Sequence, residues 1–274
     1  MPNGCTRKKD RLMNRLSSTL QSLKAEKKKA LACFLTAGFP TLDATVPYAQ
    51  EIAGHGADIL ELGMPFSDPL ADGPVIQSSS QIALQQGISL EIILSMVSSI
   101  RQESNIPIVL MGYLNPILRY GTENFFQDAA ERGVDGVILP ELPYEESGRY
   151  RARLAKLNIA NILLVTPTTS QKRIRMIDEA SNGFLYCVST TGVTGSGNVN
   201  GNAAYLRDVQ KLAKKNPVLV GFGIKSPDDA RRTAQYADGV IVGSALIKKI
   251  SEGESGKQIG SWVRELKSAM NSSS

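Results

Sequence analysis

The sequence predicts an α/β fold in which eight parallel strands, each followed by a helix, close into one (β/α)8 barrel of the TIM type. Eight short apolar runs bounded by glycine or proline alternate with eight helical patterns. The runs are mostly continuous in apolar residues rather than alternating with polar ones, as expected of strands that are covered on both faces. The length of 274 residues suits a barrel of about 250 residues. A doubly wound open sheet is the alternative, since it shows the same alternation.

The chain begins with a basic tail over residues 1–11 and an extra helix that precedes the first strand. The apolar positions of this helix, Leu12, Leu16, Leu20 and Leu23, fall at helical spacing. We therefore expect an N-terminal helix that caps the core.

The βα units follow in order, each ended by turn residues. The first strand, at 30–35, ends at the Thr-Ala-Gly-Phe-Pro run at 36–40, and Gly56 closes the helix at 42–55. The later strands are predicted at 59–63, 106–112, 136–139, 161–166, 184–189, 218–222 and 239–242. The later helices are predicted at 82–101, 123–132, 145–157, 171–180, 203–214, 227–236 and from 245 onward. No composition shift or long linker divides these units, so residues 1–274 are predicted to form a single domain.

Charge is concentrated at the N-terminus. The formal net charge is +5, yet the first 29 residues carry +7, so the remaining 245 carry −2. The body also lacks aromatic residues interleaved with basic ones. This pattern is typical of a solvated basic end, and we expect no nucleic-acid partner.

The cysteines and the hydropathy pattern indicate a cytoplasmic protein. Cys5, Cys33 and Cys187 are odd in number and form no C-x-x-C pair, which predicts reduced thiols without a zinc site or a disulfide. No apolar run approaches the roughly 18 residues needed to span a bilayer, and the N-terminus lacks the apolar core of a signal peptide. The sequence leaves a plastid address open and predicts no membrane association.

A carboxylate lies inside the second predicted strand. Residues 59–63 are apolar except for Glu61, and the loop at 64–74 holds three prolines together with Asp68 and Asp72. Successive side chains of a strand point to opposite faces, so Glu61 shares its face with Ile59 and not with the leucines on either side. An edge strand with Glu61 in water is one interpretation. In a barrel, this face can instead be the interior, near the end of the strand where barrel enzymes bind substrate.

Glycine pairs follow three of the predicted strands and favour a phosphate site. They lie at 221–224 after the seventh strand, at 243–244 after the eighth and at 192–195 after the sixth. Glycine lets the backbone approach an anion closely, and a helix begins directly after the seventh and eighth strands. Barrels commonly bind phosphate there.

Elimination leaves carboxylate chemistry. The single histidine, His55, ends a predicted helix, where a structural role or a role facing the helix dipole is expected. No lysine lies inside a predicted strand, and Lys225 falls just beyond the seventh, which disfavours a Schiff base. Acid–base catalysis by Glu61 with a second carboxylate remains. The spacing does not decide whether that second group is Asp68 or Asp72.

Five motifs make the chain similar to the tryptophan synthase alpha-chain family over roughly residues 12–268. The first, LELGMPFSDPLADGP at 60–74, is specific to that family. The others are PIVLMGYLNP at 107–116, STTGVTG at 189–195, GFGI at 221–224 and GS at 243–244.

The resemblance implies a lyase that cleaves indole-3-glycerol phosphate to indole and glyceraldehyde 3-phosphate by a retro-aldol reaction, without a metal. Glu61 matches the family's general acid–base, which protonates the indole ring carbon and takes the proton of the glycerol hydroxyl. Asp72 matches the carboxylate that stabilises positive charge at the indole nitrogen. Thr194 matches a threonine on a mobile loop that closes over substrate and meets Asp72. The remaining matches are Phe34 and Tyr186 in the pocket, and Gly195, Gly223, Gly243 and Ser244 in the phosphate cradle.

The resemblance also implies a partner. Family members pair with a beta chain, as an alpha2beta2 tetramer, and the pyridoxal phosphate belongs to the beta chain alone. The loops at 65–68 and 115–116 match the contact surface. Two departures concern loop closure and this contact: Thr190 replaces the Arg of some members, and Glu141 stands where Asp is common. Alternatives are a stand-alone lyase that releases indole and a catalytically silent barrel that acts only as an allosteric partner.

Overall fold

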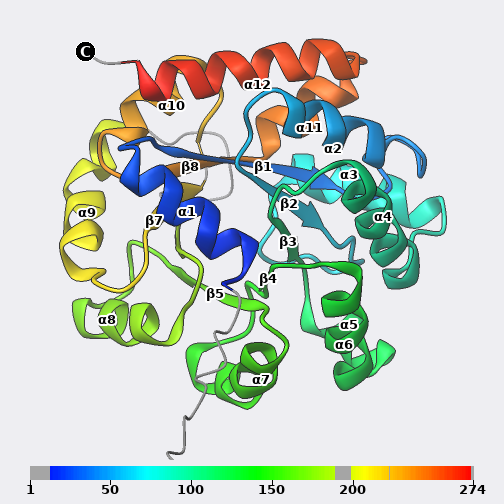
Figure 1. The fold of residues 1–274 in the computed structure, drawn as a ribbon, viewed down its shortest axis with the longest axis horizontal. Coiled ribbons are helices and arrows are strands. Elements are labelled where there is room, and N and C mark those ends of the chain that lie inside the picture. Colours follow the sequence, from blue (N-terminus) through cyan, green and yellow to red (C-terminus); the bar gives the residue numbers. More distant parts are fainter. Residues whose placement is uncertain (1–12, 189–198, 222, 273–274) are drawn as a thin grey trace, which may run out of the picture.

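The computed structural model describes residues 13–188, 199–221 and 223–272, and within them eight parallel strands close into a barrel. The strands pair in chain order, and the eighth pairs with the first (Figure 1). The barrel prediction is therefore confirmed, and the open sheet is excluded. The strands are β1 (Ala30–Thr36), β2 (Ile59–Gly63), β3 (Ile108–Met111), β4 (Gly136–Ile138), β5 (Ala160–Val165), β6 (Leu185–Val188), β7 (Val218–Gly221) and β8 (Gly239–Val242).

Helices surround the barrel in Figure 1. They are α1 (Arg15–Ala25), α2 (Thr45–Gly54), α3 (Pro74–Gln85), α4 (Leu90–Glu103), α5 (Leu114–Tyr120), α6 (Thr122–Arg132), α7 (Tyr144–Lys156), α8 (Gln171–Ala180), α9 (Val199–Leu212), α10 (Pro227–Ala234), α11 (Ser244–Ser251) and α12 (Gly256–Asn271). The predicted positions of β2, β8 and α8 agree with the structure to the residue.

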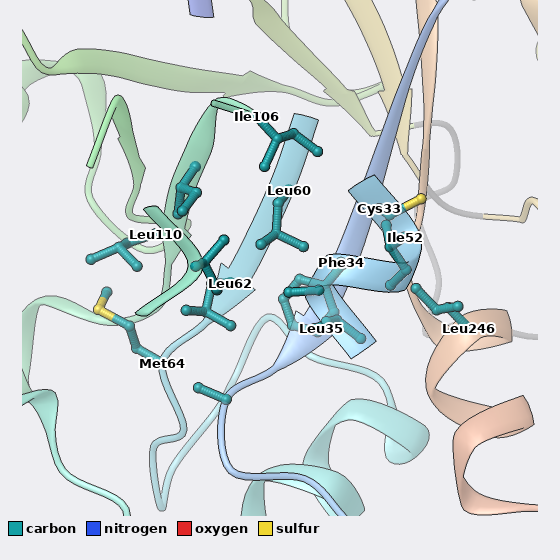
Figure 2. Close-up of a cluster of buried hydrophobic side chains, with 14 of the residues drawn as sticks. Cys33, Phe34, Leu35, Ile52, Leu60, Leu62, Met64, Ile106, Leu110 and Leu246 are labelled. Carbon is teal, nitrogen blue, oxygen red and sulfur yellow. The ribbon is translucent and has the colours of Figure 1, made fainter. Parts of the chain in front are cut away.

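The two faces of each strand serve two apolar clusters. On β2, Ile59 belongs to the cluster inside the barrel, whereas Leu60 and Leu62 belong to the cluster between strands and helices. Figure 2 shows Leu62 beside Leu35 of β1 and Leu110 of β3, which are its partners in the strand register. Glu61 shares the face of Ile59, so its side chain points into the barrel.

Helix α1 closes the N-terminal end of the barrel, as the sequence predicts. It crosses this end in Figure 1, and Leu16 and Leu20 pack with Ile59 and the other interior residues. The Asn14 side chain caps the helix, and Arg15 forms an ion pair with Asp135 at 2.8 Å. The residues before Met13 lie outside the described residues.

A hydrogen-bonded ring is repeated four times at this N-terminal end. Each ring joins a residue near the start of β1, β3, β5 or β7 to a residue shortly before the following strand. The strand residue donates its backbone N–H to the side chain of the second residue, and its carbonyl oxygen accepts the backbone N–H of that residue. The four pairs are Leu31 with Asp58, Ile108 with Asp135, Asn161 with Asn182, and Val218 with Asp238. The rings satisfy backbone groups at the barrel floor, where an unpaired amide costs about 1–3 kcal/mol.

The prediction of one helix at 82–101 is wrong. Helices α3 and α4 meet at a bend of 101°. Gly87 has φ +81° directly after the last turn of α3, and the Ser89 side chain caps the N-terminus of α4. A left-handed glycine ends a helix because it carries no Cβ to clash. The sequence patterns also do not predict α5. The helix predicted from residue 245 onward is divided into α11 and α12 at Gly253, where φ is +85°.

No single helix among the described residues is long and apolar enough to cross a membrane. The pair α3 and α4 meets the criteria of length and composition only when it is taken together across its bend. Cys33 and Cys187 are free and buried, and burial raises the pKa of both thiols. Cys5 lies outside the described residues.

Candidate active site

A cavity of about 490 Å³ opens at the C-terminal end of the barrel strands. Seven of the residues named from the sequence line it: Phe34, Glu61, Asp72, Tyr186, Gly223, Gly243 and Ser244. They come from β1, β2, β6, and the segments after β2, β7 and β8. Thr194 and Gly195 lie outside the described residues, as does Thr190.

Glu61 is a buried acid without a hydrogen-bond partner. Its exposed fraction is 0%, and among the described residues neither carboxyl oxygen meets a donor. Desolvation raises its pKa to about 8, because an ionised carboxylate is costly to bury. The group is therefore protonated near neutral pH and faces the cavity, as a proton donor would be. The interpretation that leaves Glu61 in water is wrong.

Asp72 lines the cavity from the loop that leads into α3. Desolvation is the main cause that raises its pKa, to about 6; a hydrogen bond from Tyr113 opposes this shift, and the charge of Glu141 adds to it. Its backbone carbonyl accepts a 2.8 Å hydrogen bond from the Gln77 side chain. Asp68 is exposed, bonds to the Ser67 hydroxyl and does not line the cavity. The structure thus separates the two aspartates that spacing left equivalent.

Two aromatic side chains shape the interior, and two glycines make room for them. A Cβ at Gly63 would overlap the ring of Phe34, and one at Gly221 would overlap the ring of Tyr186. Tyr186 is 4% exposed, and burial raises the pKa of its hydroxyl well above the ordinary value. It therefore remains a neutral hydrogen-bonding group throughout the physiological pH range.

The segments that follow β7 and β8 carry the features of an anion site. Gly243 is the N-cap of α11, and a glycine has no side chain to accept a hydrogen bond. The first backbone amides of the helix, from Ser244 on, are therefore not capped by a side chain. Gly223 follows β7 with φ +86°. Uncapped amides and the positive end of the helix dipole favour a phosphate here. Phe222 lies outside the described residues.

Sequence reasoning missed part of the lining. Lys248 and Lys249 of α11 reach the cavity, as does Lys225, which the sequence raised only as a Schiff-base candidate. Lys249 forms an ion pair with Glu254 at 2.8 Å. A signal for Lys248 existed, since it follows Ser244 by four positions on one helix face. The apolar lining residues Val75, Ile76, Met111, Ile224 and Ile241 carried no such signal.

Other candidates lie apart from the cavity. His55 ends α2, and its Nδ1 lies 2.7 Å from the Glu51 carbonyl oxygen, in keeping with the structural role expected of it. Across the described part of the chain, no group of three or more histidine, cysteine, aspartate or glutamate side chains is arranged to hold a metal ion.

Comparisons with known proteins agree on one family. The family model for the tryptophan synthase alpha chain matches residues 20–273. The chain is 45% identical to the alpha chain of Flavobacterium johnsoniae over 258 residues, which is 93% of this chain and 100% of that one. It is 46% identical to the alpha chain of Geotalea daltonii, covering 94% and 98%.

Solved structures show the same relationship. A crystal structure of tryptophan synthase subunit alpha from Legionella pneumophila superposes with a TM-score of 0.85 at 39% identity, covering 94% of this chain and 99% of that one. A chain of Mycobacterium tuberculosis tryptophan synthase superposes with a TM-score of 0.88 at 34% identity, covering 95% and 100%.

Proposed function

The chain belongs to the tryptophan synthase alpha-chain family, and from that premise we propose which of its residues carry out the family's reaction. It is the carbon–carbon lyase subunit of tryptophan biosynthesis, which cleaves indole-3-glycerol phosphate to indole and glyceraldehyde 3-phosphate. Indole goes on to the beta chain, which carries the pyridoxal phosphate of the complex. The proposal concerns Glu61 and Asp72 and rests most heavily on the buried, unpartnered carboxyl of Glu61.

Glu61 acts first as an acid and then as a base. Its protonated carboxyl donates a proton to the indole ring carbon that bears the glycerol chain, which leaves positive charge on the ring nitrogen. The resulting carboxylate takes the proton of the adjacent glycerol hydroxyl while the carbon–carbon bond breaks, and the bonding electrons return to the ring. The pKa of about 8 suits both steps, since a group that titrates near the working pH transfers protons efficiently in either direction.

Asp72 stabilises the positive charge that develops on the ring nitrogen. With a pKa of about 6 it is ionised at neutral pH, while Glu61 is not. Two carboxyls in different surroundings can thus hold different charges and act in different roles. A partly buried carboxylate stabilises a nearby cation more strongly than it would in water.

The substrate lies between these acids and the anion site. The phosphate binds at Gly223, Gly243 and Ser244, where the uncapped amides of α11 meet it. The indole and the glycerol chain lie beside Phe34 and Tyr186. Thr194 and Gly195 stay assigned by their match to the family motif.

A beta chain is the expected partner of a family member, and the complex is proposed to be an alpha2beta2 tetramer in the cytoplasm. Leu70, on the loop before Asp72, is 93% exposed, and Leu118 of α5 is 55% exposed. Residues 115–116, expected on a loop, lie in α5. Exposed leucines near the loop at 65–68 and in α5 suit a protein contact. Light scattering of a mixture with beta chain should give the mass of two copies of each, whereas unchanged separate masses would refute the assignment.

The direct test is indole release from indole-3-glycerol phosphate by the purified chain, with and without beta chain. Slow release that rises with beta chain is the expected result. Fast release unaffected by the beta chain would identify a stand-alone lyase. No release from folded protein in either mixture would refute the catalytic assignment.

A further inference from the structure

Three loops at the catalytic end of the barrel are linked through Tyr113 and the residue that follows it, Leu114. Tyr113 follows β3, and its hydroxyl accepts the backbone N–H of Ala71 at 3.0 Å from the loop after β2. Asp72 is the next residue along that loop, and hydrogen bonding from the same hydroxyl lowers the pKa of its carboxyl against the effect of burial. A side chain on one loop therefore holds the backbone of another loop directly beside Asp72.

Tyr113 is itself held firmly. Its exposed fraction is 5%, and its ring centroid lies 5.2 Å from that of Phe66. The preceding residue, Gly112, donates its N–H to Ile138 of β4 at 3.1 Å, and a Cβ there would press on Met64 at 2.8 Å. The tyrosine thus stands on the barrel wall rather than on a free loop.

The third loop contributes Glu141, which follows β4. Its carboxylate accepts the N–H of Leu114, the residue directly after Tyr113 and the first of α5. The Glu141 carboxylate therefore fixes the start of α5 and, with it, the backbone of Tyr113. Helix starts favour such an acceptor because their first amides have no partner within the helix.

We propose that Tyr113 is a positioning residue that aims the Asp72 carboxylate at the indole nitrogen, and that Glu141 is a second positioning residue acting through the backbone of Tyr113. The inference rests on the proposed role of Asp72 and extends it to two residues outside the cavity lining. Neither residue touches the reacting atoms. Both set the position and the charge of the group that does.

The two residues push the ionisation of Asp72 in opposite directions. The hydrogen bond from Tyr113 stabilises the carboxylate and lowers its pKa, whereas the negative charge of Glu141 raises it. The other titratable groups that line the cavity are Glu61, Tyr186, Lys225, Lys248, Lys249 and Glu252, and both variants leave all of them in place. Removing the two groups should therefore shift the pKa of Asp72 in opposite directions, a result that a loss of folding in either variant would not produce.

The experiment compares Tyr113→Phe and Glu141→Gln in the full chain. Phenylalanine keeps the ring contact with Phe66 and removes only the hydroxyl, and glutamine keeps an oxygen for Leu114 while removing the charge. Tyr120→Phe is the matched control, since its hydroxyl also donates to a carboxylate, that of Asp128 at 2.6 Å, but away from the cavity.

Tyr113→Phe should lower kcat by roughly tenfold to a hundredfold, the value of a hydrogen bond to a charged group, with a smaller change in KM. The acid limb of its kcat/KM profile should move to higher pH, and that of Glu141→Gln to lower pH. Tyr120→Phe should change neither. The inference would be overturned if the acid limbs of the Tyr113→Phe and Glu141→Gln profiles stayed at the wild-type pH or moved in the same direction.

A second readout does not depend on turnover. Carbon-13 NMR of the Asp72 carboxyl, assigned with Asp72→Asn, should show its titration moving up in Tyr113→Phe and down in Glu141→Gln. Wild-type protein that binds substrate but releases no indole would refute the proposed reaction, while this titration would still decide the positioning role. An unchanged titration in both variants would refute the inference even if the enzyme is active.

Discussion

Replacing Glu61 by glutamine should remove nearly all activity and, at the same time, remove a pH-dependent loss of stability. The pKa of Glu61 is about 8 in the folded protein, against 4.5 for an unperturbed glutamate. Between these pH values the unfolded chain releases the proton and the folded chain keeps it, so stability falls as pH rises. At about 1.4 kcal/mol per pKa unit, the loss amounts to about 5 kcal/mol by pH 8.

Urea unfolding from pH 5 to pH 8.5 measures this loss. The free energy of unfolding of wild type should fall more steeply with pH than that of Glu61→Gln, and the difference between the two slopes isolates Glu61. Asp58 and Asp72 also have raised pKa values and contribute equally to both proteins. Glu103→Gln, exposed on α4, is the control and should follow wild type.

Activity completes the test. Glu61→Gln should lose about 100- to 10,000-fold in kcat, the usual value of positioned acid–base catalysis, while still binding substrate. Parallel stability curves for wild type and the variant would refute the raised pKa. A variant that loses binding as much as turnover would show that Glu61 is mainly structural.

Three further outcomes are expected. The kcat/KM profile of wild type should be bell-shaped, rising near pH 6 as Asp72 ionises and falling near pH 8 as Glu61 loses its proton; a flat profile between pH 5 and 9 would contradict both assignments. Gly221→Ala should raise KM at least about tenfold by displacing Tyr186, which steady-state kinetics would detect. Asp58→Ala should lower the free energy of unfolding by about 3 kcal/mol in urea, because it strips Leu31 and Lys267 of a buried acceptor.

Much of the fold could be predicted from local patterns in the sequence. A strand alternates its side chains with a period of two, so the face of Glu61 followed from Ile59 and Leu60 without any knowledge of the barrel. Glycines at 221–224 and 243–244 likewise marked the anion site by local backbone chemistry. The break at Gly87 was also available locally, since a glycine after a helical run is a common C-terminal signal, but the apolar spacing on both sides concealed it.

Contacts between distant segments were beyond such patterns. The four rings at the barrel floor each use one side chain per βα pair, Asp58, Asp135, Asn182 and Asp238. These four residues cannot be recognised as a sequence repeat, because one polar residue in about every fifty does not form a detectable pattern. Lys225 lines the same cavity as Gly243 and Ser244 because the parallel pairing of β7 with β8 places the segments after these two strands side by side.

The sequence by itself determined the alternation of strands and helices, the strand face that Glu61 shares with Ile59, and the family, because these depend on periodicity and on contiguous motifs. The tertiary structure closed the barrel, buried Glu61 and separated Asp72 from Asp68, which spacing had left equivalent because both lie on one loop and differ in the neighbour each meets. That neighbour, Tyr113, is 41 residues from Asp72 in the chain and joins it through adjacent strands. Burial and hydrogen bonding between strands set the charge of a carboxyl, and neither is a property of sequence spacing.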